Sequence, residues 1–277
     1  MSVRWIVALS WIAGFAAALG LGAWLGRERG DDEAAQARGK RVATLTIVVC
    51  LAVILFRVAL PLSLEAALID WDAYALVRPW WPIPFALTLL AAGSPHMSTP
   101  AARRLVLGFA VLVGCASGFK LVSTARFDPQ DVSGVVGPDG VCGQTTSYTC
   151  GAAAAAMLLW HHGVEASERE MAELSWTNAM TGTDEFCVAR GLRQKLAGSG
   201  RVVRLETPSW EALRRRDQPG MATIKWSLFV DHWVVVREVS DAGVVIGDPI
   251  RGKLTLSEAE FREVWRGGLV TADRAAR

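Results

Sequence analysis

Hydrophobic residues are concentrated in the first half of the chain, where they form long runs with few charges. Three of these runs are Trp5–Gly26, Val42–Phe56 and Leu105–Phe119. With its flanking residues, each run approaches the roughly 20 apolar residues that a helix needs to cross a bilayer. The pattern therefore predicts three membrane-spanning helices.

A fourth apolar segment, Pro79–Gly93, is shorter and contains three prolines. It opens with Trp80 and Trp81, and tryptophan is favoured at the boundary between membrane and water. A re-entrant or surface segment is the alternative interpretation. We count it as a spanning helix, so that residues 1–125 form a transmembrane region with four helices. Their expected positions are about 4–25, 42–62, 79–94 and 104–123.

The charges between these runs predict an orientation. Residues 27–41 carry five Lys and Arg side chains, and Arg103 and Arg104 precede the last run, whereas residues 63–78 are mainly acidic. Lys and Arg are retained in cytoplasmic loops. Four spans then place everything after residue 126 outside the cytoplasm, and three spans would place it inside. We expect an integral protein of a bacterial-type inner (plasma) membrane with an extracytoplasmic C-terminal domain.

Composition agrees with a membrane protein. Hydrophobic residues make up 52% of the chain and the mean hydropathy is +0.28, which is too apolar for an ordinary soluble enzyme. The net charge of +2 is small, and no basic tract with interleaved aromatic residues occurs. The lipid bilayer is therefore an expected partner, and nucleic acid is not.

After a linker at residues 126–137, the pattern changes to that of a folded domain over 138–277. Helix signals come first: an alanine-rich stretch from Cys150 to Gly163, then capping residues at Ser167 and Thr183. Runs of strand character follow, with a turn at Ser240–Gly243 between two of them. The expected strands are 201–206, 221–226, 232–239, 243–248 and a short KLTL segment, followed by a last helix that a second capping box starts. Helices before antiparallel strands predict an α+β domain.

The domain contains three cysteines, Cys142, Cys150 and Cys187. An odd number outside the cytoplasm suggests one disulfide and one thiol kept for another purpose. Cys150 is the best candidate for that thiol, because the unpaired N–H groups and the dipole at a helix N-terminus stabilise a thiolate. Cys142 and Cys187 are the candidate disulfide. Cys187 also has helical spacing and could be a core residue, and Cys150 could be a buried, inert cysteine.

A cysteine nucleophile needs a histidine to take its proton and a third group to orient that histidine. His161 and His162 lie at the far end of the Cys150 helix, roughly 16–18 Å away at 1.5 Å per residue. His96 lies in a predicted cytoplasmic loop. His232, at the start of a strand, is the histidine best placed for the role.

The turn at Ser240–Gly243 brings the His232 strand back against the next strand, which ends at Asp248. In either register the two side chains fall within about two or three residues of facing each other. Asp248 could equally be a turn initiator before proline, and Asp231 should point to the opposite face of the strand. Gln144, six positions before Cys150, could fold back to stabilise an oxyanion, or be a polar loop residue.

Two segments carry a family resemblance: QTTSYTCGAAAAAML, and DHWVVVREVSDAGVVIGDPIRGKLTLSEAEFREVW. Together they resemble the bacteriocin-processing, or double-glycine, family of papain-like cysteine peptidases. In that family a Gln, five intervening residues and a Cys-Gly open the first helix, then a His begins a strand and an Asp precedes Pro on the next. The matching positions are Gln144, Cys150, His232 and Asp248. The resemblance implies the roles of oxyanion donor, nucleophile, general base and histidine orienter, in that order.

The resemblance covers residues 141–265, about half of the chain. Members are best known as cytosolic N-terminal domains of ABC exporters that cut leader peptides after Gly-Gly. Here the similar segment follows the apolar helices and is expected to face outward, and the sequence shows no ATPase segment. Leader-peptide processing, and an exporter or other membrane partner, therefore stay open.

The sequence predicts a membrane-anchored thiol peptidase that acts on a peptide or protein substrate, with a papain-like α+β domain. No Walker loop or Rossmann fingerprint is present, and no cofactor or metal is expected. A non-catalytic peptide-binding module of the same fold is the alternative function. A purely structural membrane protein would leave the Cys, His, Asp and Gln set unexplained.

Overall fold

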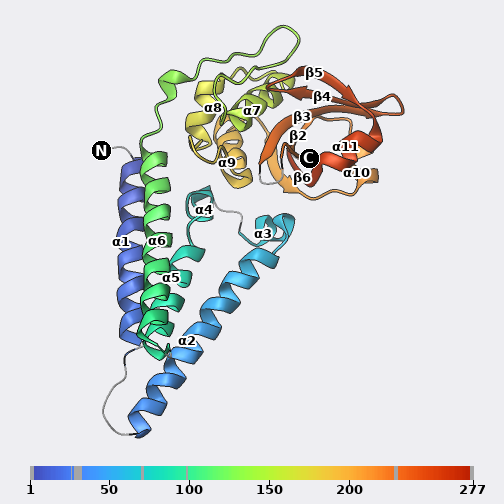
Figure 1. The fold of residues 1–277 in the computed structure, drawn as a ribbon. Helices are drawn as coiled ribbons and strands as arrows, with labels where there is room; N and C mark the ends of the chain where they lie inside the picture. The colour runs from blue at the N-terminus through green and yellow to red at the C-terminus, as the bar shows by residue number, and fades with distance from the viewer. Residues whose placement is uncertain are drawn as a thin grey trace. The chain divides into compact units, whose positions relative to one another are not determined.

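The computed structural model of the chain describes residues 3–25, 27, 33–69, 72–97, 99–227 and 230–274 (Figure 1). The chain forms two compact units. The first contains Met1–Leu60 and Val77–Arg126, and the second contains Pro61–Leu76 and Phe127–Arg277.

The first unit consists of long helices. They are α1 (Val3–Leu25), α2 (Glu33–Ala59), α5 (Pro82–Gly93) with a 3₁₀ turn at Ser94–His96, and α6 (Pro100–Ala125). Among the described residues, four helical stretches are long and apolar enough to cross a membrane by length and composition. The prediction of four apolar helices is confirmed.

The third predicted helix contains three prolines, and the structure shows why they do not prevent helix formation. The stretch Tyr74–His96 contains α4 (Asp72–Val77) from Tyr74 onward, a turn, and then α5. α5 begins at Pro82, so that proline occupies the first turn, where a missing N–H costs nothing. Gly22 of α1 lies so close to α5 that a Cβ would be 2.5 Å from the Thr88 carbonyl oxygen, so glycine is needed for this contact.

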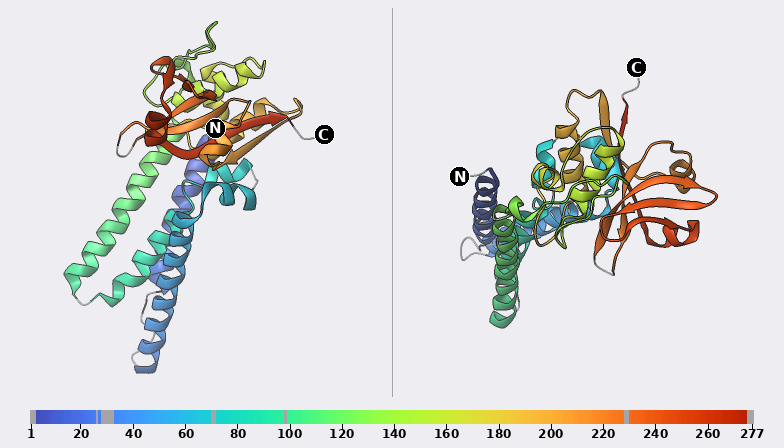
Figure 2. Two further views of the ribbon diagram at one scale, coloured as in Figure 1. Left: turned by 90° about the vertical axis from the view of Figure 1, so that its right-hand side faces the viewer. Right: turned by 90° about the horizontal axis from the view of Figure 1, so that it is seen from above.

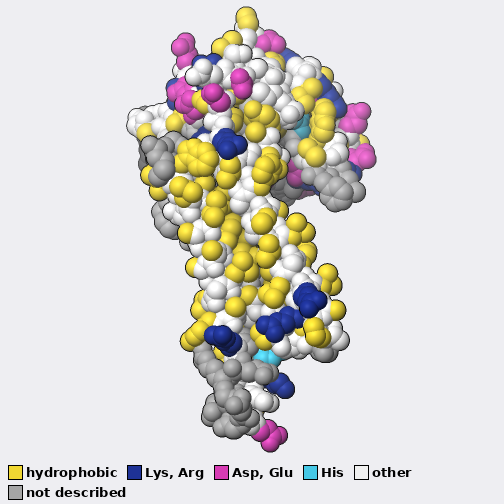
Figure 3. Space-filling view, turned by 60° about the vertical axis from the view of Figure 1, so that its left-hand side comes forward, with side chains coloured by type: hydrophobic (Ala, Val, Ile, Leu, Met, Phe, Trp, Pro, Cys, Tyr) yellow, Lys and Arg dark blue, Asp and Glu magenta, His cyan; other side chains and the backbone are white. Residues whose placement is uncertain are grey.

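Large hydrophobic side chains lie on the outer surface of this unit as well as in its interior. Figure 3 shows them gathered over the helices, with Lys and Arg side chains toward one end. Exposed examples are Leu45, Leu105, Phe109 and Phe119. A water-soluble helical bundle would bury such residues, whereas a bilayer favours them on the surface.

The second unit includes a segment that the sequence placed with the transmembrane region. α3 (Leu62–Leu68) and α4, except for its last residue Val77, belong with the C-terminal domain. The ring of Tyr74 packs edge-on against Phe186 at 5.4 Å, and the Cys187 thiol lies 3.4 Å from the Ala75 carbonyl oxygen. Pro61–Leu76, which includes the first residues of the third apolar stretch, therefore contributes to the folded domain, and no local pattern indicated this.

Among the described residues of 138–277, three α-helices precede the strands, as predicted. These are α7 (Cys150–His161), α8 (Glu168–Leu174) and α9 (Glu185–Lys195). The strands form one antiparallel sheet in the order β1-β6-β2-β3-β4-β5. Their bounds are β1 (Arg201–Glu206), β2 (Gly220–Lys225), β3 (Asp231–Ser240), β4 (Gly243–Asp248), β5 (Gly252–Leu256) and β6 (Trp265–Arg274). The α+β prediction is confirmed.

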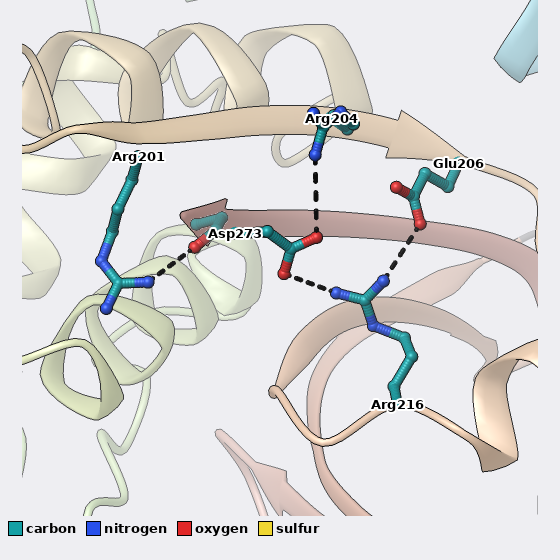
Figure 4. Close-up of polar contacts among 6 residues, drawn as sticks. Arg201, Arg204, Glu206, Arg216 and Asp273 are labelled. Atoms are coloured by element: carbon teal, nitrogen blue, oxygen red, sulfur yellow. Dashed lines mark hydrogen bonds and ion pairs between the residues drawn. The ribbon is translucent and has the colours of Figure 1, made fainter. Parts of the chain in front are cut away.

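Strand β6 was not predicted, and it lies between β1 and β2. Its last residues join a cluster of charges shown in Figure 4, where Arg216 bridges Asp273 of β6 at 2.7 Å and Glu206 of β1 at 3.3 Å. Arg204 reaches the same aspartate at 3.9 Å. These contacts tie the two strands together across the sequence.

The sheet is covered on both faces (Figure 2). α7 lies against β2, β3 and β4, whereas α10 (Trp210–Arg214) and α11 (Glu258–Val264) pack on the other face. On that face Leu213 and Phe261 meet alternate residues of the strands in a buried core. The capping box predicted at Ser257 starts α11, with both of its hydrogen bonds formed.

Candidate active site

Cys150 is the first residue of α7, at the edge of a cleft of about 410 Å³. The helix behind it is buried, and its five alanines have no exposed surface. Gly151 fits because it lacks a side chain: a Cβ would lie 2.9 Å from the Thr183 Cβ and 3.1 Å from the Trp233 ring. The small residues of the Cys-Gly-Ala stretch therefore let α7 press its N-terminus against the sheet.

His232 lies at the start of β3 and is 3% exposed. β3 and β4 pair with Val235 opposite Gly247, so one further step places Val234 opposite Asp248. His232 is two residues before Val234 and therefore shares its face. The imidazole Nε2 lies 2.8 Å from the Asp248 Oδ1. The predicted His–Asp neighbourhood is present in the structure.

The electrostatics of His232 join it to both of its neighbours. Burial by itself lowers the pKa of His232, but hydrogen bonds to Asp248 and Cys150 and the negative charges of both raise it to about 9. With Nε2 directed to Asp248, the second ring nitrogen is the one available to the thiol. The imidazole is therefore protonated at neutral pH.

Asp248 serves as histidine partner and turn initiator at once. Its Oδ1 also accepts hydrogen bonds from the backbone N–H groups of Ile250 at 2.8 Å and Arg251 at 3.3 Å. Burial raises the pKa of this carboxyl, but the hydrogen bonds from His232 and the backbone outweigh it and hold the pKa below its ordinary value. The two interpretations of Asp248 in the sequence are thus compatible.

Gln144 lies beside the turn that follows Asp248. Its backbone N–H donates to the Pro249 carbonyl oxygen at 3.0 Å, and its side-chain Nε2 donates to the Thr146 carbonyl oxygen at 2.7 Å. Its Oε1 is buried and has no hydrogen-bond partner among the described residues. The glutamine therefore belongs to the same neighbourhood as Asp248, and its part in binding an oxyanion stays a prediction.

Trp226 is a site residue that the sequence did not reveal. Its ring centroid lies 5.1 Å from that of His232, and the Arg251 guanidinium lies 4.8 Å from the Trp226 ring on a cation–π contact. The indole thus packs against the His232 imidazole. The chain has 12 tryptophans, many of them in apolar runs, so nothing in the pattern singled this one out.

The cleft beside Cys150 is lined by residues of the α7 N-terminus, the loop before α9 and the start of β3. The side chains of Tyr148, Met180, Thr183, Val230 and Trp233 contribute to it. Asp231 also lines it, and its carboxylate pairs with Arg266 at 2.7 Å rather than with His232, as strand alternation predicted. Cys150 is buried and is among the residues that line this cleft.

The predicted disulfide between Cys142 and Cys187 is absent from the structure, and this expectation is corrected. Cys187 lies on α9 with its thiol toward the Ala75 carbonyl, whereas the buried Cys142 thiol lies 3.9 Å from the Gly143 carbonyl. Burial and the nearby Glu168 charge raise the pKa of Cys142 to about 12, so this thiol is unreactive. The described residues include no group of three or more His, Cys, Asp or Glu that could hold a metal ion.

Comparison with known proteins identifies the domain. Residues 140–277 match the model of the peptidase C39 family. The chain is 29% identical over 144 residues to an uncharacterised protein of Methanothermobacter marburgensis, a match that covers 52% of this chain and 95% of that protein. It is 31% identical over 127 residues to the lactococcin-G-processing and transport ATP-binding protein LagD of Lactococcus lactis subsp. lactis, covering 46% of this chain and 18% of that protein.

Two solved structures are also similar. One is the peptidase domain of Streptococcus ComA, a bi-functional ABC transporter involved in quorum sensing, with a TM-score of 0.43 at 21% identity over 52% of this chain and 98% of that one. The other is a double-glycine motif protease from an AMS/PCAT transporter in complex with its leader peptide, with a TM-score of 0.42 at 18% identity over 52% and 99%. From the family match, residues 140–277 of this chain belong to the peptidase C39 family of cysteine peptidases, and a helical region precedes them.

Proposed function

We propose that this protein is a membrane-anchored cysteine peptidase in which Cys150 is the nucleophile, His232 the general acid and base, and Asp248 the group that orients His232. The observation that carries the proposal is the buried imidazole of His232, which interacts with the Asp248 carboxylate on one side and the Cys150 thiol on the other. Cys150 also lines an open cleft, so a substrate can reach it.

The protonation state supports the first step. Because the pKa of His232 is about 9, the imidazole carries a positive charge at neutral pH, and this charge beside Cys150 favours the thiolate that the reaction needs. The Cys150 thiolate attacks the carbonyl carbon of a peptide bond, and a C–S bond forms as the carbonyl oxygen becomes an oxyanion. The backbone N–H of Cys150, at the helix N-terminus, and the side-chain amide of Gln144 are the proposed donors to that oxygen.

The remaining steps return the enzyme to its starting state. The C–N bond of the intermediate breaks as imidazolium His232 donates its proton to the leaving amine, which leaves an acyl thioester on Cys150. Neutral His232 then takes a proton from water, the hydroxide adds to the thioester carbonyl, and the C–S bond breaks to release the carboxylic acid. The thiolate and the imidazolium are restored.

The substrate class follows from the family and stays broad. The name of LagD describes processing and transport of lactococcin G, and the AMS/PCAT protease was solved in complex with a leader peptide. For this chain we propose a peptide or protein substrate, without committing to cleavage after Gly-Gly. An exporter or another membrane protein could deliver it.

We propose that the apolar helices anchor the enzyme in a plasma membrane. Lys40 and Arg41 lie near the start of α2, and Arg103 and Arg104 lie in the first turn of α6. Both helix starts are at the same end of the first unit (Figure 1). By the positive-inside rule this end is cytoplasmic. Four crossings then place the peptidase domain outside the cytoplasm.

The test uses the full chain purified in detergent and a proteome-derived tryptic peptide library, with new N-termini identified by mass spectrometry. Wild type is expected to generate new N-termini, and Cys150→Ala and His232→Ala are expected to generate none. Cys115→Ala, in α6, is the matched control and should behave as wild type. Cleavage that persists in Cys150→Ala would overturn the proposal. Peptides that are retained but not cut by wild type would favour a peptide-binding module.

A further inference from the structure

A buried carboxylate that the proposed chemistry does not use lies behind the loop that carries Gln144. Glu168, the first residue of α8, has no exposed surface. Its Oε1 accepts a hydrogen bond from the Thr145 backbone N–H at 2.8 Å, and its Oε2 accepts from the Thr145 hydroxyl at 2.5 Å and the Gly134 backbone N–H at 2.9 Å. The carboxylate therefore binds the loop that contains Thr145 through both oxygens and the segment that contains Gly134 through Oε2.

No ion pair to a lysine or arginine balances this carboxylate in the part of the chain that the structure describes. Burying a charged group is costly unless hydrogen bonds replace the lost water. Glu168 receives three such hydrogen bonds, and two of them come from one residue, Thr145. The free energy of this buried charge therefore depends directly on where Thr145 is held.

Thr145 is the neighbour of Gln144, and further contacts lead from there to the nucleophile. The Gln144 side-chain amide donates to the Thr146 carbonyl oxygen, and Thr146 and Thr149 exchange hydrogen bonds through their hydroxyls and backbone. Thr149 is buried and immediately precedes Cys150. On the other side, the Gln144 backbone N–H is bound to Pro249, which follows Asp248. Gln144 is thus held on one side by the Pro249 carbonyl oxygen and on the other by its neighbour Thr145, which Glu168 binds.

The linker before the domain is held by the same end of α8. The Arg169 side chain donates to the carbonyl oxygens of Val132 at 2.9 Å and Gln130 at 3.1 Å. At Gly134 a Cβ would lie 2.5 Å from the Glu168 Oε2 and 2.5 Å from the Gly143 carbonyl oxygen. Glycine is therefore required where the linker crosses between Glu168 and the loop that leads to Gln144.

We propose that Glu168 is a positioning residue for this enzyme: its carboxylate fixes Thr145 so that the Gln144 amide is held at the place where the oxyanion forms. The inference rests on the proposed function, because it gives Gln144 a role that exists only during attack on a carbonyl. Glu168 lies behind the loop and does not touch the substrate.

Two reactions of the same thiol separate this role from general support of the fold. Peptide hydrolysis builds negative charge on oxygen, whereas alkylation of Cys150 by iodoacetamide needs the thiolate but forms no oxyanion. In Glu168→Gln we expect hydrolysis of the library peptides to fall at least about 10-fold in kcat/KM, because a displacement of about 1 Å costs up to ~10²-fold. Alkylation should stay within about 2-fold of wild type across pH 6–9, because the His232–Asp248 pair is untouched.

A double-mutant cycle with Gln144→Ala makes the coupling specific. If Glu168 acts through Gln144, adding Glu168→Gln to Gln144→Ala should change kcat/KM by less than about 2-fold. The matched control is Glu170→Gln on the same helix, whose side chain pairs with Lys195 and is partly exposed. This control should cleave as wild type does. Full additivity of the two variants would overturn the proposal.

A second pair of variants addresses the possibility that Glu168→Gln does not fold. Thr145→Val removes the hydroxyl that Glu168 binds, and Thr145→Ser keeps it. We expect slow hydrolysis with ordinary alkylation for Thr145→Val, and near-wild-type hydrolysis for Thr145→Ser. If hydrolysis and alkylation decline together in both Glu168→Gln and Thr145→Val, the role is structural and the proposal fails. If wild type cleaves nothing, the proposed function fails with it, whereas equal cleavage by wild type and Glu168→Gln overturns the positioning role alone.

Discussion

Asp248→Asn is the substitution that tests the electrostatics of the site most directly. Asparagine has nearly the same shape, and its Oδ1 can still accept the Ile250 and Arg251 backbone N–H groups, so the turn is preserved. What disappears is the negative charge 2.8 Å from the His232 Nε2. The burial that lowers the pKa of His232 remains. The pKa of His232 should therefore fall from about 9 toward its ordinary value of 6.5.

The size of the effect follows from the difference between the two pKa values of His232. The interval from 6.5 to about 9 corresponds to about 3 kcal/mol in favour of the imidazolium, or ~300-fold, at ~1.4 kcal/mol per pKa unit. Cys150 shares in raising the pKa, so removal of the Asp248 charge should account for part of it. We therefore expect the ratio of the thiolate–imidazolium pair to the neutral thiol–imidazole pair to fall by at least about 10-fold and at most ~300-fold.

The assay is the second-order rate of Cys150 alkylation by iodoacetamide between pH 5 and pH 10, with the modified peptide quantified by mass spectrometry. Wild type should keep a plateau of reactivity on the acid side, which Asp248→Asn should lose, and the two should converge at pH 10. The matched control is Asp231→Asn, the same change one residue from His232, at a side chain that pairs with Arg266. Its profile should match wild type.

Superimposable profiles for Asp248→Asn and wild type would refute the reasoning, because the charge would then contribute nothing to the ion pair. A lower rate at every pH, without a change of shape, would also contradict it. That result would mean that the substitution altered access to the thiol rather than the protonation of His232.

Three further outcomes are expected. Folding raises the pKa of His232 to about 9, so the protonated imidazole stabilises the folded state fully below about pH 6.5, and this stabilisation is lost as the pH rises through 9. The melting temperature should therefore fall over this pH range in wild type and much less in Asp248→Asn. Equal slopes of melting temperature against pH would contradict this reasoning. Phe261 has no exposed surface, so Phe261→Ala should lower the free energy of unfolding in urea by about 3–5 kcal/mol. Glu263 is exposed, and Glu263→Ala should lower it by less than ~0.5 kcal/mol. Similar losses in the two variants would disprove the assignment of Phe261 to the core. Gly151→Ala would place a Cβ 2.9 Å from the Thr183 side chain, so it should cut peptide hydrolysis at least ~10-fold, and unchanged hydrolysis would show that the α7 N-terminus can move.

Much of the fold could be predicted because its signals are local. Long apolar runs indicate membrane helices, and the capping residues at Ser167 and Ser257 start helices in the structure. The turn at Ser240–Gly243 fixes β3 against β4, and this local hairpin is enough to predict that His232 and Asp248 share one neighbourhood. Each of these features depends on residues close together in the chain, where backbone preference and side-chain period act directly.

The tertiary structure decided whatever depends on contacts between distant segments. β6 enters the sheet between β1 and β2, and the segment containing Tyr74 packs with the C-terminal domain, although neither follows from its own sequence. The count of cysteines favoured a disulfide, but the thiols of Cys142 and Cys187 lie against different backbone groups. A count of cysteines does not show whether two sulfur atoms lie close enough to bond, and a disulfide requires a specific distance and orientation.

The support of the site is the clearest case of this division. The sequence by itself determined the chemical groups: a cysteine at a helix start, a histidine at a strand start, an aspartate at the next strand end and a glutamine before the helix. Only the tertiary structure placed Trp226 over His232 and the Glu168 carboxylate behind Thr145. Tryptophan and glutamate are common residues with no spacing to mark them, and their roles arise from burial and direction, which exist only when the chain is folded.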